Sequence, residues 1–389
     1  MPTRVISTPT RWRPCEHAAA ARRARLYAVH PPGWNEFVTA PPRQRPDLLT
    51  RAQISALPDP ARLDYEEHRS VWHANLGPLR TPQMRAVHEH LDDIVEANRQ
   101  DGDKVKGAAV IDAYPGLGKS TIAQVFARTF HHRQVSLYGP VTDAGHDRVP
   151  VVHVCLTSST SKRSFNAMLC RFFGLPGHDR GNAEELGHRA ADAVLSCDVR
   201  LCVVDDVHFL DPRRRDGRDV ANHFKYLANT FPVTFIYVGV GLEQRGLVSE
   251  GLAAGEEELA QNARRWTTLG VDPFQIGTEP GRRIWRQLLL AIEKDLVLAG
   301  THPGMVADKL ADYLFARSTG HFASLMTLIT RGCRRAIRTG AENLTRDLLD
   351  QVRNDAAAEA ARQELLAAFG AGKLSARPAA AGARALAAG

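Results

Sequence analysis

Ala113-Tyr114-Pro115-Gly116-Leu117-Gly118-Lys119-Ser120, followed by Thr121, is the stretch from which the rest of the chain is interpreted. An apolar run at 108–111 precedes it and a run with helical spacing at 122–127 follows, which predicts a strand, a turn and a helix. Glycine in the turn lets backbone N–H groups curl around an anion without interference from Cβ atoms. The helix that begins here adds the positive end of its dipole. The stretch therefore predicts a phosphate-binding P-loop.

The side chains of this loop have separate predicted roles. Lys119 is expected to reach the β- and γ-phosphates of a nucleotide, and the Ser120 hydroxyl is expected to bind Mg²⁺. Ala113 stands where glycine is usual, which is tolerated if its backbone torsions are ordinary and is a problem only if φ is positive. All nine residues from Ala113 to Thr121 are predicted to line the nucleotide site.

Length and composition limit the classes of protein to which the chain can belong. With 389 residues it suits two or three domains. No apolar stretch approaches the roughly 18 residues of a membrane span, and the N-terminus lacks the apolar region of a secretory signal. The six cysteines include no C-x-x-C pair, as in reduced cytosolic proteins, so we expect a cytoplasmic protein without a membrane partner. The net charge of +7 permits an acidic partner such as nucleic acid.

Residues 1–75 are predicted to form a basic arm rich in Pro and Arg. Its first 60 residues carry nine Arg against four acids, which is typical of an arm with helical pieces rather than a packed domain. Trp12, Trp34 and Phe37 are interleaved with these arginines. One interpretation is that they stack on nucleic acid bases, and the other is that the arm wraps around the chain's own core or a neighbouring subunit.

The pattern of apolar runs predicts an α/β fold, a P-loop NTPase with a five-stranded parallel sheet and helices on both faces. The predicted strands are 107–113, 149–156, 201–205, 233–238 and 266–271. A helix expected from Thr81 precedes the first strand, and its N-terminal end is a candidate for contact with adenine. These segments assign 76–278 to a nucleotide-binding domain.

The pattern after residue 278 is helical. We expect an all-helical lid at 279–368, followed by a disordered Ala/Gly tail at 369–389. The predicted lid helices are 281–299, 304–317, 321–338 and 345–368. Arg331, Arg334, Arg335 and Arg338 recur every three or four residues, so they share one helix face suited to DNA, a partner or solvent.

An apolar strand that ends in Asp205 and Asp206 is the expected Walker B partner of the P-loop. Asp205 is predicted to hold Mg²⁺ through its water shell. Asp206 is predicted to orient or deprotonate the attacking water. Glu is commoner in that role and is one methylene longer, so we expect slow hydrolysis. The next strand ends in Gly239-Val240-Gly241, which offers no side chain to contact the γ-phosphate.

Arg264 and Arg265 precede the last predicted strand and complete the predicted catalytic residues, which also include Lys119 and Asp206. An arginine on a subunit edge suits a finger delivered to the γ-phosphate of a neighbouring subunit. The alternative is a pair of surface arginines.

With these motifs in this order, the chain resembles the AAA+ superfamily of ATPases. More narrowly, it is similar to the TniB/TnsC group of transposition ATPases. The residues that carry the narrower resemblance are Asp205-Asp206-Val207-His208, Val238-Gly239, Thr319-Gly320-His321-Phe322 leading into Leu325, Leu328 and Ile329, Ala336–Glu342 and Leu344-Thr345. The resemblance covers about residues 75–350 and is loose outside the nucleotide motifs.

The resemblance implies ATP and Mg²⁺ as cofactors and an ATPase that binds double-stranded DNA. It also implies self-association into a ring or filament that recruits or stimulates a transposase. Two positions depart from the group: Asp206 where Glu is usual, and Val240 where Thr is common. These departures argue against brisk ATP turnover but not against ATP-dependent assembly.

Two other classes of function stay open. The strand that ends in Asp-Asp-Val also resembles STAND-type signalling switches, which normally continue into a long repeat array that we do not find here. A AAA+ loader or replication-initiator relative would usually carry a winged helix after the lid, where this sequence has the Ala/Gly segment. Binding to DNA distinguishes the signalling switch from the other two classes.

Overall fold

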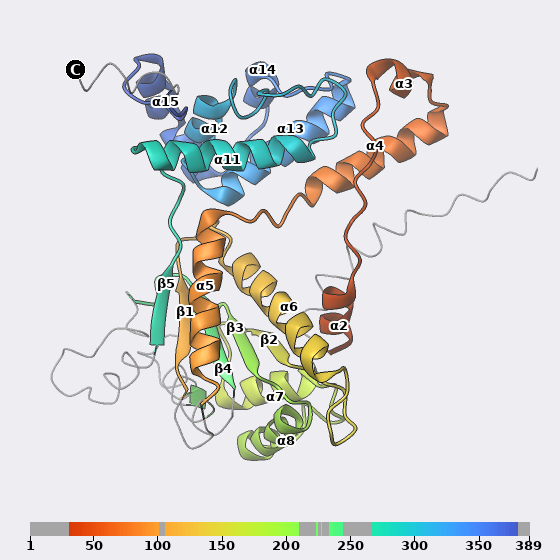
Figure 1. Ribbon diagram of the computed structural model, residues 1–389, viewed down its shortest axis with the longest axis vertical. Helices are drawn as coiled ribbons and strands as arrows, with labels where there is room; N and C mark the ends of the chain where they lie inside the picture. Colours follow the sequence, from red (N-terminus) through yellow and green to blue (C-terminus); the bar gives the residue numbers. More distant parts are fainter. Residues whose placement is uncertain are drawn as a thin grey trace, which may run out of the picture.

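The structure, a computed structural model, describes residues 31–100, 106–209, 223–224, 227, 233–243 and 266–379. Its two parts are stacked along the long axis, an α/β part below and an all-helical part above (Figure 1). Across the described ranges, no helix is both long and apolar enough to span a bilayer.

The α/β part is built on five parallel strands in the order β2-β3-β4-β1-β5. The strands are β1 (Ala108–Asp112), β2 (Val151–Cys155), β3 (Leu201–Asp205), β4 (Thr234–Gly239) and β5 (Trp266–Gly270). The inner strands are buried along almost their whole length, as expected for a parallel sheet covered on both faces. The predicted five-stranded parallel sheet is therefore confirmed.

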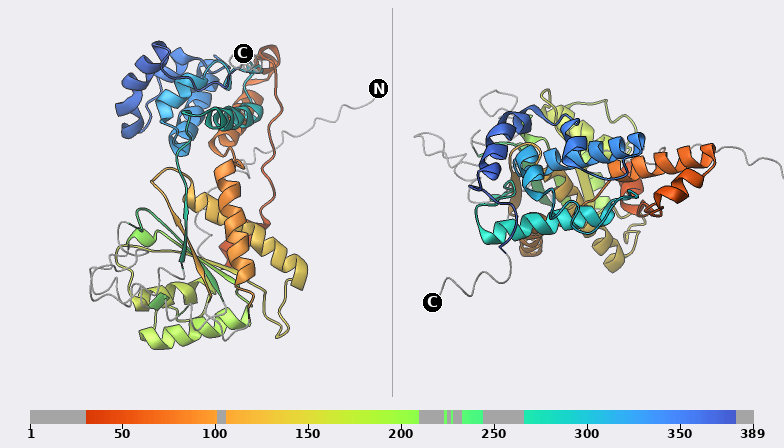
Figure 2. Two further views of the ribbon diagram at one scale, coloured as in Figure 1. Left: turned by 60° about the vertical axis from the view of Figure 1, so that its left-hand side comes forward. Right: turned by 90° about the horizontal axis from the view of Figure 1, so that it is seen from above.

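Helices cover both faces of this sheet (Figure 2). The helices of this part are α5 (Pro82–Ala97), α6 (Lys119–Tyr138), α7 (Lys162–Phe172) and α8 (Ala183–Ser196), with a short 3₁₀ turn η1 (Val207–Phe209) after β3. Thr81 caps α5 by accepting a hydrogen bond from the Met84 N–H, and Pro82 stands in the first turn. This start places the N-terminal end of α5 beside the lid.

The helical lid is also confirmed, with different internal boundaries. Its helices are α11 (Glu279–Asp295), α12 (Ala311–Ser318), α13 (Phe322–Thr339), α14 (Arg346–Asp350) and α15 (Ala356–Gly370). The helix expected from 304 begins only at Ala311. The reason is that the buried Glu293 carboxylate accepts hydrogen bonds from the N–H groups of Gly304, Val306 and Ala307, which fixes a non-helical turn there.

The single helix expected at 345–368 is two helices, α14 and α15. Between them, the buried Arg317 guanidinium donates to the carbonyls of Leu349 and Val352. Asp355 then caps α15 by accepting the Ala358 N–H. Because these two carbonyls accept hydrogen bonds from the buried arginine, they need no backbone N–H groups four residues further along the chain, and the helix does not continue.

The N-terminal segment packs onto both parts of the molecule (Figure 1). Its helices are α2 (Pro31–Thr39), α3 (Arg51–Ala56) and α4 (Asp59–Ala74). On α2, Trp34 is fully buried and its Nε1–H donates to His131 Nδ1 on α6 at 3.2 Å. Trp34 therefore packs on the chain's own core, as in the second interpretation of the arm, whereas Trp12 lies outside the described residues.

Helix α4 lies against the lid rather than in a separate arm. The fully buried Arg69 donates two hydrogen bonds, of 2.7 and 3.0 Å, to the Glu342 carboxylate. His73 Nε2 accepts the Val297 N–H at 3.0 Å. Residues of the expected arm thus contribute to the core of the lid.

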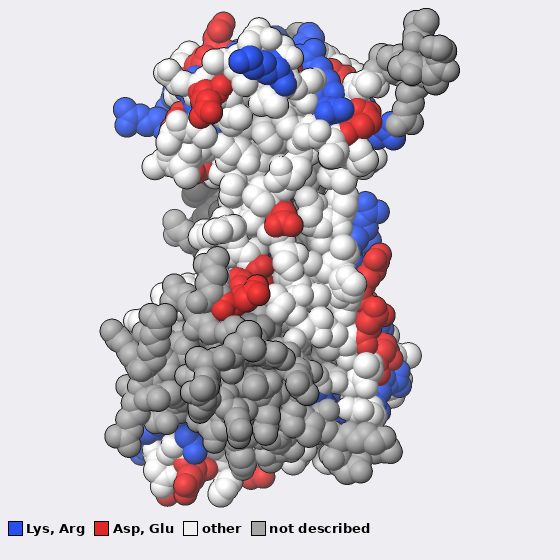
Figure 3. Space-filling model, turned by 90° about the vertical axis from the view of Figure 1, so that its left-hand side faces the viewer, with Lys and Arg blue, Asp and Glu red and all other residues white. Residues whose placement is uncertain are grey.

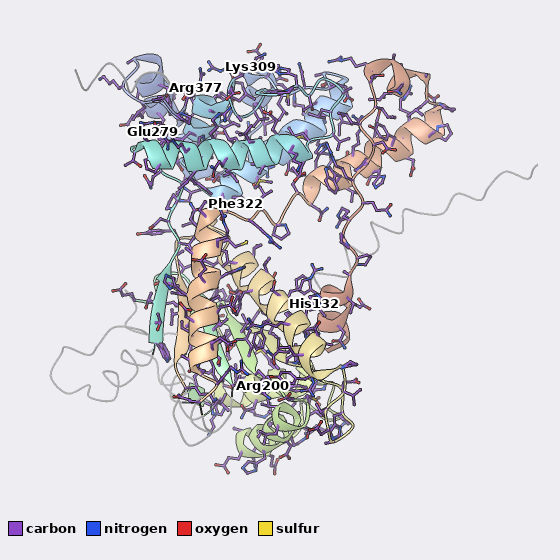
Figure 4. All side chains as sticks on the ribbon, viewed as in Figure 1. His132, Arg200, Glu279, Lys309, Phe322 and Arg377 are labelled. Atoms are coloured by element: carbon purple, nitrogen blue, oxygen red, sulfur yellow. The ribbon has the colours of Figure 1, made fainter. Side chains whose placement is uncertain are left out.

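Residues 371–379 also differ from the expected disordered tail. The Ala376 N–H donates to Asp312 Oδ1 at 2.7 Å, and Ala376 is fully buried. Arg377 pairs with Asp312 at 3.3 Å, and the Ala379 N–H donates to Glu279 at 3.2 Å. Figure 4 shows Arg377 and Glu279 on the same side of the lid. This segment is held against α11 and α12 by hydrogen bonds from its backbone N–H groups to side-chain carboxylates, which composition does not reveal.

Candidate nucleotide site

The P-loop connects the end of β1 to the start of α6. Gly116 and Gly118 have φ of 81° and 86°, in the left-handed region where a side chain is strained. Ala113 is not among the residues with positive φ, so the alanine at the first position has the ordinary torsions that it needs. The local sequence therefore accounts for the shape of the loop, alanine included.

Lys119 is folded back onto the loop that it follows. Its side chain is buried, and Nζ donates to the carbonyls of Ala113 and Tyr114 at 2.8 and 2.9 Å. Burial lowers the pKa of Lys119, while the charges of Asp112, Asp205 and Asp206 oppose that shift. The ammonium thus lies at the loop, among backbone oxygens that a phosphate can replace as partners.

The acid pair lies at the carboxyl end of β3. Asp205 is buried, and its Oδ1 accepts the Asp206 N–H at 2.8 Å. Asp206 has φ of 59°, a conformation that costs about 1–2 kcal/mol in a residue other than glycine and is typical of functional sites. Burial raises the pKa of Asp206, and Asp205 raises it further, whereas His208 and Lys119 lower it. Asp206 is therefore a carboxylate with raised proton affinity beside the P-loop.

The residues predicted to hold Mg²⁺ suit that ion. Asp205 offers a buried carboxylate, and Ser120 offers a hydroxyl in the first turn of α6. Ser120 directly follows Lys119, whose pKa is affected by the charge of Asp205, so the two predicted ligands belong to the same site. Mg²⁺ prefers such hard oxygen ligands and retains several waters.

The end of β4 carries a glycine because of packing. A Cβ on Gly239 would lie 2.6 Å from Leu242 Cδ2, and Leu242 is almost fully buried. The turn after β4 folds this leucine over the strand end. A polar side chain at position 239 is therefore excluded unless Leu242 moves.

A cavity of about 500 Å³ lies between the P-loop, the start of α5 and the lid. Apolar side chains from all three regions line it: Leu76, Leu79, Met84, Leu117, Ile122, Val271, Phe274, Phe322 and Met326. Phe322 stands at the junction of the lid and the upper end of α5 (Figure 4). The size and apolar lining suit a purine base. Thr81 lines the cavity from the N-terminal end of α5, which the sequence offered as a candidate for contact with adenine, whereas the lid residues carry no local signal for this role.

The lid contacts the P-loop directly through α13. The Ala323 N–H donates to the Gly116 carbonyl at 2.9 Å. A separate close approach lies within the lid, at Gly320, where a Cβ would lie 2.2 Å from the Phe274 carbonyl oxygen. The glycine in Thr319-Gly320-His321-Phe322 therefore has a packing reason. In the sequence, Thr319-Gly320-His321-Phe322 indicated a resemblance to a family but gave no sign of the contact between Gly320 and Phe274.

The structure brings the P-loop, Lys119, Asp205 and Asp206 together. Arg264 and Arg265 lie outside the described residues, so their predicted role as a finger stays a prediction. The catalytic roles of the other residues also stay predictions.

Comparisons with known proteins agree with this fold. A family model described as "AAA domain" matches residues 102–247. The structure of the ORC1 protein of Aeropyrum pernix in complex with DNA is similar, with 18% identity and a TM-score of 0.52, covering 76% of this chain and 69% of that chain. The ORC2 protein of the same organism, solved as ADPNP-ADP complexes, gives 14% identity and a TM-score of 0.51, covering 76% and 72%. Curated protein sequences gave no match. At these identities the likeness shows the fold, which is that of AAA+ ATPases.

Proposed function

We propose, from the AAA+ fold of this chain, that it binds ATP with Mg²⁺ and hydrolyses ATP slowly. The observation that carries the proposal is the apolar cavity that adjoins the P-loop under the lid. The cavity suits the base, and the loop N–H groups with Lys119 suit the phosphates. Bound Mg²⁺ would offset the phosphate charge, held by Ser120 and Asp205.

Asp206 is the proposed base for the attacking water. Its raised pKa brings it nearer to the range in which a carboxylate accepts a proton effectively. Its carboxylate is one methylene shorter than the usual Glu, and Gly239 contributes no contact to the γ-phosphate. Both features support slow turnover.

We further propose that the chain regulates transposition by assembling on double-stranded DNA and recruiting or stimulating a transposase. The motif resemblance supports this, as does the net charge of +7. On α13, Arg331, Arg334 and Arg338 are exposed. On the face in Figure 3, basic and acidic side chains are interspersed over the lid, which suits a few phosphate contacts rather than one broad basic field.

A replication-initiator or loader-like ATPase is the second candidate. The two solved structures described above are both ORC proteins, and one of them is in complex with DNA. This likeness supports the fold alone. As a proposal, the initiator-like role shares nucleotide binding and DNA binding with the transposition role, and the two roles differ in the protein partner.

The test is binding of random-sequence duplex DNA with ATP, ADP or no nucleotide, over a salt series. We expect large cooperative complexes with ATP only, and a salt dependence that reflects several phosphate contacts. Lys119→Ala should abolish the complexes, whereas Lys294→Ala, which removes an exposed lysine on α11, should retain them. Failure to bind DNA in every nucleotide state would overturn the DNA-binding proposal.

A second measurement separates the two candidates. The genes beside this one are first searched for a transposase, and complexes assembled with ATP are then incubated with the transposase that this search finds. Retention of the transposase supports the transposition role. Assembly on DNA without retention favours the initiator-like role.

A further inference from the structure

Three side chains with different metal-binding groups converge beside the nucleotide site. His153 and Cys155 are two residues apart on β2, so they project from the same face of the sheet. Asp205 on β3 is the register partner of Cys155. One imidazole nitrogen, the Cys155 Sγ and one carboxylate oxygen lie within 4.8 Å of one another, the one such group found among the residues that the structure describes. The pairing of two parallel strands brings this group together.

The chemistry of the group differs from that of a Mg²⁺ site. A thiolate and an imidazole favour a borderline-soft cation such as Zn²⁺, whereas Mg²⁺ favours oxygen ligands. Once the metal ion has displaced the thiol proton of Cys155, the thiolate and the carboxylate carry two negative charges, which neutralise a dication in a buried site. Bond lengths of about 2.0–2.3 Å to a tetrahedral ion need ligand atoms roughly 3.3–3.8 Å apart, so small side-chain movements would close the group around Zn²⁺. Three protein ligands leave the fourth position for water.

We propose that His153, Cys155 and Asp205 form a binding site for Zn²⁺, and that Zn²⁺ bound there withdraws Asp205 from the Mg²⁺ of the nucleotide. The site is thus an inhibitory metal site. The binding of Zn²⁺ stands on the geometry of the three residues. Only the inhibition rests on the proposed ATP-binding function.

The surroundings of the group hold its histidine in place. His153 is almost fully buried, and its ring stacks on Trp34 with centroids 6.3 Å apart and planes at 18°. Trp34 itself is held by its hydrogen bond to His131. Packing of Trp34 on the ring thus holds the imidazole, while Cys155, at the end of β2, is only partly buried.

The first experiment uses the full chain without nucleotide and Co²⁺ as a spectroscopic probe. We expect a thiolate-to-cobalt charge-transfer absorption at one equivalent of Co²⁺, which Zn²⁺ displaces. Cys155→Ser should remove this absorption and weaken Zn²⁺ binding at least about 100-fold. Cys197→Ser, at a partly buried cysteine after α8, is the matched control and should leave both unchanged. No absorption in the wild type, or absorption that persists in Cys155→Ser, would overturn the site.

Trp34 gives an independent readout that does not depend on the thiol. Its stacking on His153 means that Co²⁺ bound to the imidazole should quench its fluorescence. Quenching in the wild type that disappears in Trp34→Phe supports the site. Quenching that persists unchanged in Trp34→Phe contradicts binding at His153.

The inhibition is tested on protein loaded with Zn²⁺ and desalted to remove the excess. We expect the affinity for Mg²⁺-ATP to fall at least about tenfold in the wild type and to be unchanged in Cys155→Ser treated in the same way. Cobalt binding with no change in ATP affinity overturns the inhibition. Cobalt binding by a protein that binds no ATP even without Zn²⁺ overturns the proposed function and leaves the metal site supported.

Discussion

The backbone N–H of Ala323, at the start of α13, donates a 2.9 Å hydrogen bond to the carbonyl oxygen of Gly116 in the P-loop. The lid is therefore attached to the loop that is proposed to enclose the phosphates. A movement of this loop on nucleotide binding would be transmitted to the first turn of α13 through this hydrogen bond. We therefore expect nucleotide occupancy and lid position to be coupled through this contact.

Hydrogen exchange should report this coupling. With saturating ATP and Mg²⁺, we expect exchange in the first turn of α13 to slow about tenfold or more, because opening there would require release of the ligand. Helix α15 lies in the same lid and contributes no residue to the cavity, so its exchange should not change. Mass spectrometry of the wild type and Lys119→Ala measures both. Equal slowing in the two helices would show a global effect instead.

Filling the apolar cavity should separate recognition of the base from recognition of the phosphates. Met326 lines the cavity from α13, and Met326→Trp would occupy the space proposed for adenine. We expect ATP affinity to fall at least about tenfold, with tripolyphosphate affinity unchanged. Met326→Leu conserves volume and should bind both ligands normally. Calorimetric titration measures the affinities, and equal loss for both ligands would place the base elsewhere.

Asp206 should show a conflict between stability and activity. Asp206→Gly relieves the left-handed strain at φ 59° and should raise the free energy of unfolding by up to about 1 kcal/mol while abolishing hydrolysis. Asp206→Asn tolerates the same torsion and should lower phosphate release about 100-fold with ATP binding retained. Denaturant unfolding and phosphate release measure the two effects. Full activity of Asp206→Asn would mean that another group activates the water.

The buried Arg69–Glu342 pair should stabilise the contact between α4 and the lid. Arg69→Met leaves the Glu342 carboxylate, 7% exposed, without its cation and should cost about 3–5 kcal/mol in unfolding free energy. The double variant Arg69→Met/Glu342→Gln should cost less than the sum of the two single changes.

The exposed pair of Arg62 and Asp59 on the same helix is the matched control. Its side chains are 40% and 80% exposed, so Arg62→Ala should change stability by less than about 0.5 kcal/mol. Urea unfolding measures all of these variants. Equal effects of Arg62→Ala and Arg69→Met would contradict the assigned role of burial.

Stability should fall as the pH drops from about 6.5 to about 4. Burial lowers the pKa of His73, His131 and His223 from 6.5 to about 4. Nearby positive charges contribute to this lowering of the pKa values: Arg69 and Arg45 act on His73, His132 acts on His131, and Lys162 acts on His223. The unfolded chain then binds more protons than the folded chain between these values. Each histidine contributes at most about 1.4 kcal/mol per pH unit, and the contribution is fully present above about pH 6.5.

Urea unfolding at pH 7.5, 6 and 5 measures this slope. His131→Gln removes one of the three groups and should reduce the slope between pH 6 and 5. His90→Gln changes an exposed histidine on α5 and should leave the slope as in the wild type. A slope that is the same in both variants would contradict the assignment to buried histidines.

Much of the fold could be predicted from the sequence because its signals are local. The predicted strand at 201–205 matches β3, and the other strands differ by a few residues at their ends. The P-loop needs positive φ at Gly116 and Gly118, and the identity of a residue limits its own torsions. The order of strands and helices then leaves few topologies.

The candidate site was predictable only in part. The loop, Lys119, Asp205 and Asp206 are marked by residue types next to strands, so the sequence locates them. The lid residues of the cavity, such as Phe322 and Met326, look like any apolar helix face. Their place in the cavity wall depends on the packing of the lid against the P-loop and the start of α5.

The P-loop, the parallel sheet and the helical lid follow from local features of the chain, because apolar periodicity and glycine torsions depend on residues that are close in sequence. Three contacts depend instead on how the folded elements pack: Arg69 pairs with Glu342, the Ala323 N–H donates to the Gly116 carbonyl, and His153, Cys155 and Asp205 converge. These groups are far apart in the chain. Their contacts follow from the packing of whole helices and strands. Many individually weak dispersion contacts and the loss of conformational entropy together decide that packing, and no local sequence pattern encodes their total.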